Sequence, residues 1–178
     1  MFNTGAGARS SITRRRPSVA RWLAAGVLAV ATIAMAGGPA LAAAGGTGHT
    51  VTMTEHQHGT FTDTGATNPC TGAPGVATFD GNAVQHVTYF PAGDEVWSTF
   101  TETGKVTVTW DGVTYSGHAT AWGNFNMNEK NANSTFTLTI RVFAPDGSSV
   151  VGHEVSHFAL NAGGVITVNF DKLSFTCT

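Results

Sequence analysis

Asn68-Pro69-Cys70-Thr71-Gly72 is the stretch around which this 178-residue chain is organised. It is a run of turn-forming residues and contains one of the two cysteines of the chain, while the other, Cys177, is the penultimate residue. In an oxidising compartment an even number of cysteines usually forms disulfides, and two cysteines allow one pairing. We therefore predict a Cys70–Cys177 disulfide that ties the last strand back to an early loop.

Residues 1–42 have the order of a secretory signal peptide. Arg14-Arg15-Arg16 precede a mainly apolar run from Trp22 to Ala36, and Ala40-Leu41-Ala42 is a small-x-small cleavage signature. A membrane-spanning helix needs about 20 apolar residues, and this run is shorter. We therefore divide the chain into a signal peptide, 1–42, and a secreted domain, 43–178, with no transmembrane segment after cleavage and an extracellular location.

The charge of the secreted domain excludes some partners. Removal of residues 1–42 leaves four of the nine Lys and Arg but all eleven Asp and Glu, a formal net charge of −7 with His neutral. A nucleic-acid binder needs clustered cations that displace counterions. Nucleic acid is therefore excluded as a partner, and an anionic membrane surface is disfavoured for the same reason.

Alternation with a period of two residues recurs along the secreted domain and indicates β-strands. Its clearest instance is 135–143, where Phe136, Leu138, Ile140 and Val142 alternate with Thr and Arg. Asp111-Gly112 is a strong signal for a two-residue hairpin turn. We also expect a tight turn at Thr103-Gly104. The pattern predicts about eight strands, at 50–62, 75–90, 96–103, 105–110, 113–127, 135–143, 150–160 and 165–176.

The predicted fold class is all-β: a single antiparallel meander of about eight strands, closed into a barrel, with one disulfide. Closure removes the unpaired edges of a sheet and places the last strand beside the first, where the predicted disulfide needs them. An open two-sheet sandwich is the alternative. An eight-stranded barrel is either packed with side chains or holds one small ligand.

The signal peptide, the Thr-rich first strand, the Asn-Pro-Cys-Thr-Gly motif at 68–72, the Val84-Gln85-His86-Val87-Thr88 segment and the late Cys177 together resemble a family of small secreted actinobacterial proteins without an established activity. This family is similar in architecture to calycin and allene-oxide-cyclase-like barrels. The resemblance implies a secreted barrel and carries no catalytic residue over to this chain, because that architecture hosts both binding proteins and isomerases.

The apolar sets on alternating strands predict the lining of the barrel interior, because side chains on alternate positions share one face. His153 or His157 would then be the polar group that orients a ligand in an apolar lumen. The predicted lining residues are Val106, Val108, Trp110, Phe136, Leu138, Ile140, Val142, Val151, His153, Val155 and His157.

His153-Glu154-Val155-Ser156-His157 spells H-E-x-x-H, which binds zinc when it lies on a helix. Its flanks are those of a strand, where the two histidines would lie about 13 Å apart and could not share a metal ion. We therefore predict no metal site, no cofactor and no catalytic residues.

The first functional hypothesis is a non-enzymatic, secreted β-barrel that binds a small apolar molecule in its interior. One alternative is a barrel isomerase or cyclase that uses an interior His or Glu as acid or base. A second alternative is an extracellular structural or envelope protein with a packed interior. The sequence predicts no particular ligand and no oligomeric state.

Overall fold

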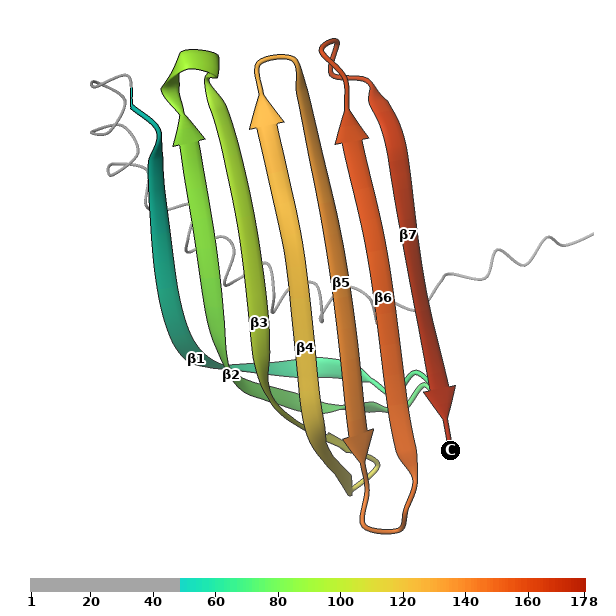
Figure 1. The fold of residues 1–178 in the computed structure, drawn as a ribbon. Coiled ribbons are helices and arrows are strands. Elements are labelled where there is room, and N and C mark those ends of the chain that lie inside the picture. Colours follow the sequence, from blue (N-terminus) through green and yellow to red (C-terminus); the bar gives the residue numbers. More distant parts are fainter. Residues whose placement is uncertain (1–48) are drawn as a thin grey trace, which may run out of the picture.

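The computed structural model describes residues 49–178, which form one antiparallel sheet of seven strands (Figure 1). Each strand pairs with its neighbours in sequence, so the sheet is a simple meander. The predicted all-β class and antiparallel meander are therefore confirmed, whereas the predicted signal peptide, 1–42, lies outside the described residues. The strands are β1 (Val51–Thr67), β2 (Pro74–Phe90), β3 (Glu95–Trp110), β4 (Val113–Asn128), β5 (Asn131–Phe143), β6 (Ser149–Leu160) and β7 (Ile166–Cys177).

Short turns join most of the strands. Asp111 and Gly112 both have positive φ, 50° and 77°, which is what a two-residue hairpin turn between β3 and β4 needs. A single 3-10 turn, η1 (Pro91–Gly93), connects β2 to β3 and is followed by Asp94 in the left-handed conformation. Gly147 turns the chain between β5 and β6 with φ 89°. Because of these short connections, strands that follow one another in the sequence lie side by side and antiparallel in the sheet.

The meander has seven strands and not eight, because residues 95–110 form one continuous strand, β3. The expected turn at Thr103-Gly104 is wrong. Gly104 pairs with Gly81 of β2 and Ala119 of β4, and the register continues unbroken through it. A Cβ atom on Gly104 would lie 2.7 Å from Cζ of Phe79. This glycine therefore makes room for a neighbouring ring, and it does not reverse the chain.

The sheet is open, so the predicted closed barrel is wrong. β1 and β7 are its two edges, and each pairs with one neighbour only. The two-sheet sandwich is wrong as well, because all seven strands belong to one sheet. With one strand fewer than predicted, the sheet is narrower by about 4.8 Å, the spacing between paired strands. The alternation of residues in the sequence does not indicate whether the two edge strands, β1 and β7, come close enough to pair.

The two edges are nevertheless joined at one end. The lower parts of β1 and β2 curl across toward the end of β7 (Figure 1). There the Cys70–Cys177 disulfide, with 6.2 Å between the Cα atoms, connects the β1–β2 loop to the last strand, so the predicted pairing is confirmed. We call this end of the sheet the stapled half. The open half is the other end, where the β2–β3, β4–β5 and β6–β7 turns lie.

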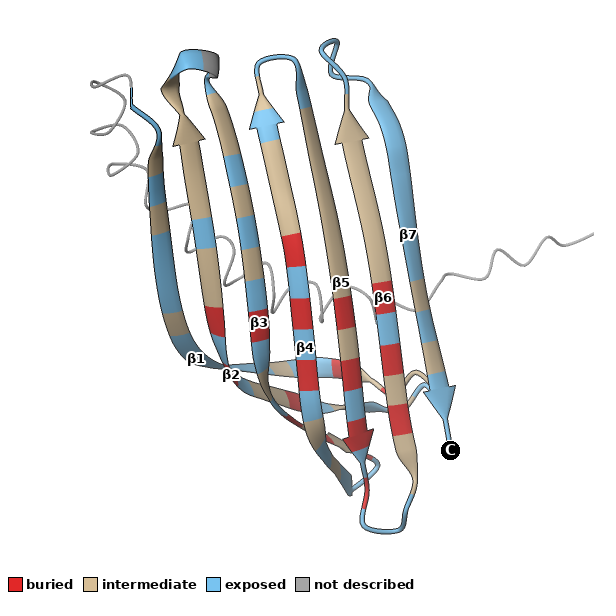
Figure 2. Ribbon diagram, viewed as in Figure 1, coloured by how far each residue is buried: buried red, intermediate tan, exposed pale blue. Residues whose placement is uncertain are grey.

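The curl gives the sheet an inner face, which carries the buried core, and an outer face. Buried residues gather in the stapled half, while inner-face side chains of the open half are mostly half-buried (Figure 2). Partly buried rings of Phe79, Phe100, Phe136 and Phe175 pack against this core. The core residues are Ala66, Ala77, Val106, Val108, Trp110, Ala119, Ala121, Leu138, Ile140, Val142 and Val150.

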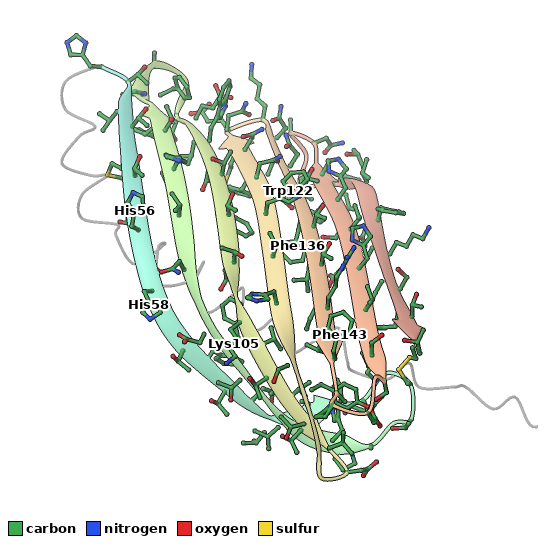
Figure 3. All side chains as sticks on the ribbon, turned by 60° about the horizontal axis from the view of Figure 1, so that its bottom comes forward. His56, His58, Lys105, Trp122, Phe136 and Phe143 are labelled. Atoms are coloured by element: carbon green, nitrogen blue, oxygen red, sulfur yellow. A yellow bond between two sulfur atoms is a disulfide. The ribbon has the colours of Figure 1, made fainter. Side chains whose placement is uncertain are left out.

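The outer face is rich in threonine and histidine. Its side chains pair across strands: Thr52 Oγ1 lies 3.0 Å from Thr88 Oγ1, and Thr54 Oγ1 lies 2.8 Å from Nδ1 of His86. All histidines of the strands lie on this face, and Figure 3 labels two of them on β1. These histidines are His56, His58, His86, His118, His153 and His157.

Candidate functional site

The lining residues predicted on β3 and β5 lie on the inner face. Those on β3 are buried, with exposed fractions of 1–4% for Val106, Val108 and Trp110. On β5, Leu138, Ile140 and Val142 are buried. Phe136, which is labelled in Figure 3, is partly buried and packs against the core. Their part in holding a ligand stays a prediction.

The lining residues predicted on β6 face the opposite side of the sheet from the one predicted. Val151, His153, Val155 and His157 lie on the outer face, where His153 is exposed and the other three are half-buried. Nδ1 of His157 lies 2.9 Å from Thr135 Oγ1, and Nδ1 of His153 lies 3.1 Å from Thr139 Oγ1. Neither His153 nor His157 therefore lies in the interior as the predicted orienting group.

The inner face of β6 is formed by the other set of alternating residues. Val150, Gly152 and Glu154 are buried there. Valines occupy both sets of alternating positions on this strand, so its local pattern could not decide which set faces inward. Pairing with β5 decides it, because Gly152 lies opposite the buried Ile140 and Glu154 lies opposite the buried Leu138.

The H-E-x-x-H sequence lies within strand β6, so the predicted strand is confirmed. Its two histidines point to the outer face and its glutamate points to the inner face. Among residues 49–178, no group of three or more His, Cys, Asp or Glu side chains is arranged to hold a metal ion. The absence of bound zinc from the protein stays a prediction.

Two buried glutamates mark the boundary between the stapled half and the open half. Glu102 of β3 is 5% exposed and Glu154 of β6 is 6% exposed. Each is the last buried residue of its strand toward the open half. They share one cross-strand row, with Ala121 and Leu138 between them. Three strand spacings therefore separate them, about 14 Å along the sheet.

One oxygen of each buried carboxyl group lacks a hydrogen-bond partner. The Oε2 atoms of Glu102 and Glu154 are both buried and make no hydrogen bond. Glu102 lies between Ala83 and Ala121 on the neighbouring strands, and neither side chain can donate a hydrogen bond. In folded proteins the large majority of buried polar side-chain atoms have a partner. Asp63 Oδ2 and Trp110 Nε1 are also buried without a partner, but the two glutamates are the buried acids of the inner face.

Burial favours the protonated form of these two acids, because an apolar environment disfavours the charged form. It raises the pKa of Glu102 from its ordinary value of 4.5 to about 7. Burial also raises the pKa of Glu154, and the negative charge of nearby Asp171 raises it further. Perturbed carboxyl groups of this kind are candidates for a functional site when geometry supports the same conclusion.

Aromatic rings lie next to Glu102 toward the open half. Phe100 is two residues before Glu102 on the same face, and its ring stacks on that of Phe136 with 6.3 Å between centroids. A Cβ atom on Gly123 would lie 2.6 Å from the Phe100 ring, so this glycine provides the space in which the ring lies. The inner face thus combines stacked rings with an unpaired carboxyl group.

Sequence reasoning missed both glutamates. In the structure Glu102 has the same parity as Val106 and Val108 on one strand, but the turn expected at Thr103-Gly104 separated it from those valines in the prediction. Its setting, Thr101-Glu102-Thr103, looks like an exposed polar segment. Glu154 lies inside the H-E-x-x-H sequence, which was considered only as a zinc motif and rejected as one.

The Asn68-Pro69-Cys70-Thr71-Gly72 loop holds one cysteine in place through its own hydrogen bonds. Oδ1 of the buried Asn68 accepts hydrogen bonds from the backbone N–H groups of Cys70, at 2.8 Å, and Thr71, at 3.2 Å. The N–H of Gly72, which has φ 81°, donates to the carbonyl oxygen of Asn68 at 2.8 Å. This asparagine turn orients Cys70 toward Cys177. The motif therefore has a structural role at the stapled end.

No protein-family model, curated protein or solved structure matches the chain. Within the described residues, the single 3-10 turn Pro91–Gly93 is the only helical element, and no helix there has the length and hydropathy of a membrane span. The function is therefore argued from the inner face.

Proposed function

We propose that this protein is a secreted, disulfide-stapled β-sheet protein that binds a small, mainly apolar molecule on the inner face of its sheet. The observation that supports this best is that the apolar lining continues past the buried core into the open half. There Phe100, Phe125, Phe136 and Phe158 share the inner face and are only half-buried. Removing apolar surface from water is favourable by about 25 cal/mol for each Å². A ligand that covers these rings would therefore form a complex stabilised by this burial.

The alternative of a structural protein with a packed interior draws support from the stapled half. Val108 and Val142 are fully buried there, and the disulfide closes that end. The half-buried rings of the open half favour binding over a purely structural role, because a packed interior would bury them. The two halves of one sheet thus support different roles, a rigid base and a binding surface.

The binding proposal is tested with a neutral apolar fluorophore, N-phenyl-1-naphthylamine, titrated into the secreted protein. Phe136 and Phe143 lie on the same strand, β5, but Phe136 faces inward whereas Phe143 faces outward and is 55% exposed. We expect Phe136→Ala to weaken binding by about tenfold, a loss of about 1.4 kcal/mol, because the ligand loses a ring contact. The matched variant Phe143→Ala should bind like the wild type. Absence of binding, or equal effects of both variants, would contradict the proposal.

An isomerase or cyclase that uses an inner-face acid or base is a second candidate. The observation in its favour is Glu102, since a carboxyl group with a pKa of about 7 can donate and accept a proton near neutral pH. The histidines of the strands do not fit this role, because they lie on the outer face.

A carbon-acid probe, 5-nitrobenzisoxazole, tests this second candidate. A carboxylate removes its ring proton while the N–O bond breaks, and the phenolate product is coloured. We expect a rate that rises with pH through about 7, as Glu102 ionises, and that Glu102→Gln abolishes. The outer-face variant Asp80→Asn should retain the rate. Equal rates for Glu102→Gln and the wild type would exclude Glu102 as the base.

A further inference from the structure

The sheet separates its charged side chains by sign. The outer face carries every Lys and Arg of the strands, together with the six strand histidines and two acids, Asp80 and Glu95. The inner-face positions carry acids and no Lys, Arg or His in the described strands. The outer cations are Lys105, Arg141 and Lys172, and the inner acids are Glu55, Asp63, Glu102, Glu154 and Asp171. A surface with one sign of charge and apolar walls attracts ligands of the opposite sign.

Two of these inner acids are buried with one carboxyl oxygen that makes no hydrogen bond. Glu102 and Glu154 are more than nine-tenths buried, and the Oε2 atom of each has no hydrogen-bond donor. Both lie where the packed core ends and the half-exposed lining begins. A donor that lies on the half-exposed lining is therefore next to these carboxyl groups, whereas the core behind them supplies none.

The surroundings favour a cationic donor over other groups. An anionic ligand would meet only like charge on this face, and a neutral hydroxyl would leave the negative charge of an ionised carboxylate uncompensated. An N–H of a protonated amine forms a charge-assisted hydrogen bond, which is roughly twice as strong as a neutral one. The faces of aromatic rings also attract cations, and the Phe100–Phe136 stack lies beside Glu102.

We propose that the ligand is an organic amine with an apolar body, whose protonated nitrogen is held by Glu102 or Glu154 while its body lies along the phenylalanines of the open half. This inference rests on the proposed binding function and names the chemical class of the ligand. The separation of about 14 Å along the sheet gives each glutamate its own position for a nitrogen.

The test uses three fluorescent probes that share a dansyl group and a long alkyl chain and differ only at the chain end: a primary amine, a methyl group or a carboxylate. We expect the amine probe to bind the wild-type protein about tenfold or more tightly than the methyl probe, which corresponds to about 1.4 kcal/mol or more. The carboxylate probe should bind most weakly. In Glu102→Gln/Glu154→Gln the preference for the amine should disappear while affinity for the methyl probe is retained.

A control variant separates a local effect from net charge. Asp80→Asn/Glu95→Gln removes the same number of carboxyl groups, but from the outer face, and should keep the amine preference. If the amine and methyl probes bind equally to the wild type, or if the inner double variant keeps the preference, the amine inference is overturned while the binding proposal stands. If none of the three probes binds, the binding proposal is overturned, and the amine inference with it.

Discussion

Glu102 shows how a single residue acquires unusual chemistry from its neighbours. The residues opposite it on both adjacent strands are alanines, Ala83 and Ala121, which exclude water without offering a hydrogen bond. The carboxyl group is therefore more stable in its protonated form, and its pKa rises to about 7. The two protonation states of this group interconvert at neutral pH, which is why it bears on both proposed functions.

The first prediction is that this residue makes stability depend on pH. Between its ordinary pKa of 4.5 and its folded value of about 7, the folded protein keeps a proton that the unfolded chain has lost. The free energy of unfolding therefore falls as pH rises through this window, and the stabilisation present below it is gone above about pH 7. We expect a fall of roughly 1–3 kcal/mol from this residue, measured by urea unfolding across the pH range. Glu154 contributes in the same direction, since its pKa is also raised.

The variant Glu102→Gln should show a clearly smaller fall, because glutamine does not titrate. Asp80→Asn on the outer face is the matched control and should keep the fall of the wild type. Superimposable pH profiles for Glu102→Gln and the wild type would show that the buried carboxyl group does not titrate in this range.

At the scale of the strands, glycines on the inner face make room for phenylalanine rings of the same strand or of the adjacent one. A Cβ atom on Gly81 would lie 2.4 Å from the Phe79 ring, and one on Gly152 would lie 2.8 Å from the Phe175 ring. Glycine in a strand often marks close approach or a bend. Here these positions let the sheet curl around large rings without losing register. Gly104 also lies against the Phe79 ring, and in the sequence it looks like a turn residue, which explains the wrong turn expected at Thr103-Gly104.

The second prediction compares two glycines in one cross-strand row. A Cβ atom on Gly104 would lie 2.5 Å from the carbonyl oxygen of Asp80 and 2.6 Å from Cα of Gly81, whereas one on Gly59, at the edge strand β1, would meet nothing within 4 Å. We expect Gly104→Ala to lower the free energy of unfolding by about 1–3 kcal/mol, because backbone must move to accept the methyl group. Gly59→Ala should be close to neutral. Urea unfolding of both variants measures this, and equal stabilities would contradict the close packing at Gly104.

At the scale of the whole molecule, one covalent bond takes the place of the strand pairing that would close a barrel. The cysteines are 107 positions apart in sequence, and their bond joins the β1–β2 loop to β7. Backbone hydrogen bonds between Ser149 and Thr178, at 2.7 and 3.1 Å, hold the chain end beside it. The open half has no such connection between β1 and β7 in the described structure. Stability is therefore expected to decrease from the stapled half to the open half.

The third prediction concerns this bond. Cross-linking a loop of about 100 residues removes unfolded-state entropy worth about 4.7 kcal/mol in the chain-entropy model, and measured losses on removal are about 2–5 kcal/mol. We expect Cys70→Ser/Cys177→Ser to lose a value in this range by urea unfolding. The wild-type protein in reducing buffer serves as the comparison and should match the double variant. An unchanged free energy of unfolding in both would show that the bond does not hold the two edges together.

Much of this fold could be predicted from the sequence because it depends on local pattern. Alternating apolar residues identified most strands and the inner faces of β3 and β5, as Val108 and Leu138 show. Asp111-Gly112 predicted a hairpin turn, because few residues adopt positive φ at two consecutive positions. The disulfide followed from counting, since two cysteines allow one pairing.

Tertiary structure alone decided the inner face of β6, the open edge and the candidate site. Val150 and Val151 put apolar residues on both faces of β6, so pairing with β5 and not local pattern chose Glu154 for the interior. Closure of the sheet depends on whether the edge strands β1 and β7, which are far apart in sequence, come close enough to pair. Alternation of apolar and polar residues along a strand carries no information about the distance between those two strands. Glu102 and Glu154 are more than fifty positions apart in the chain. They share one row only because the registers of three successive strand pairs bring them there.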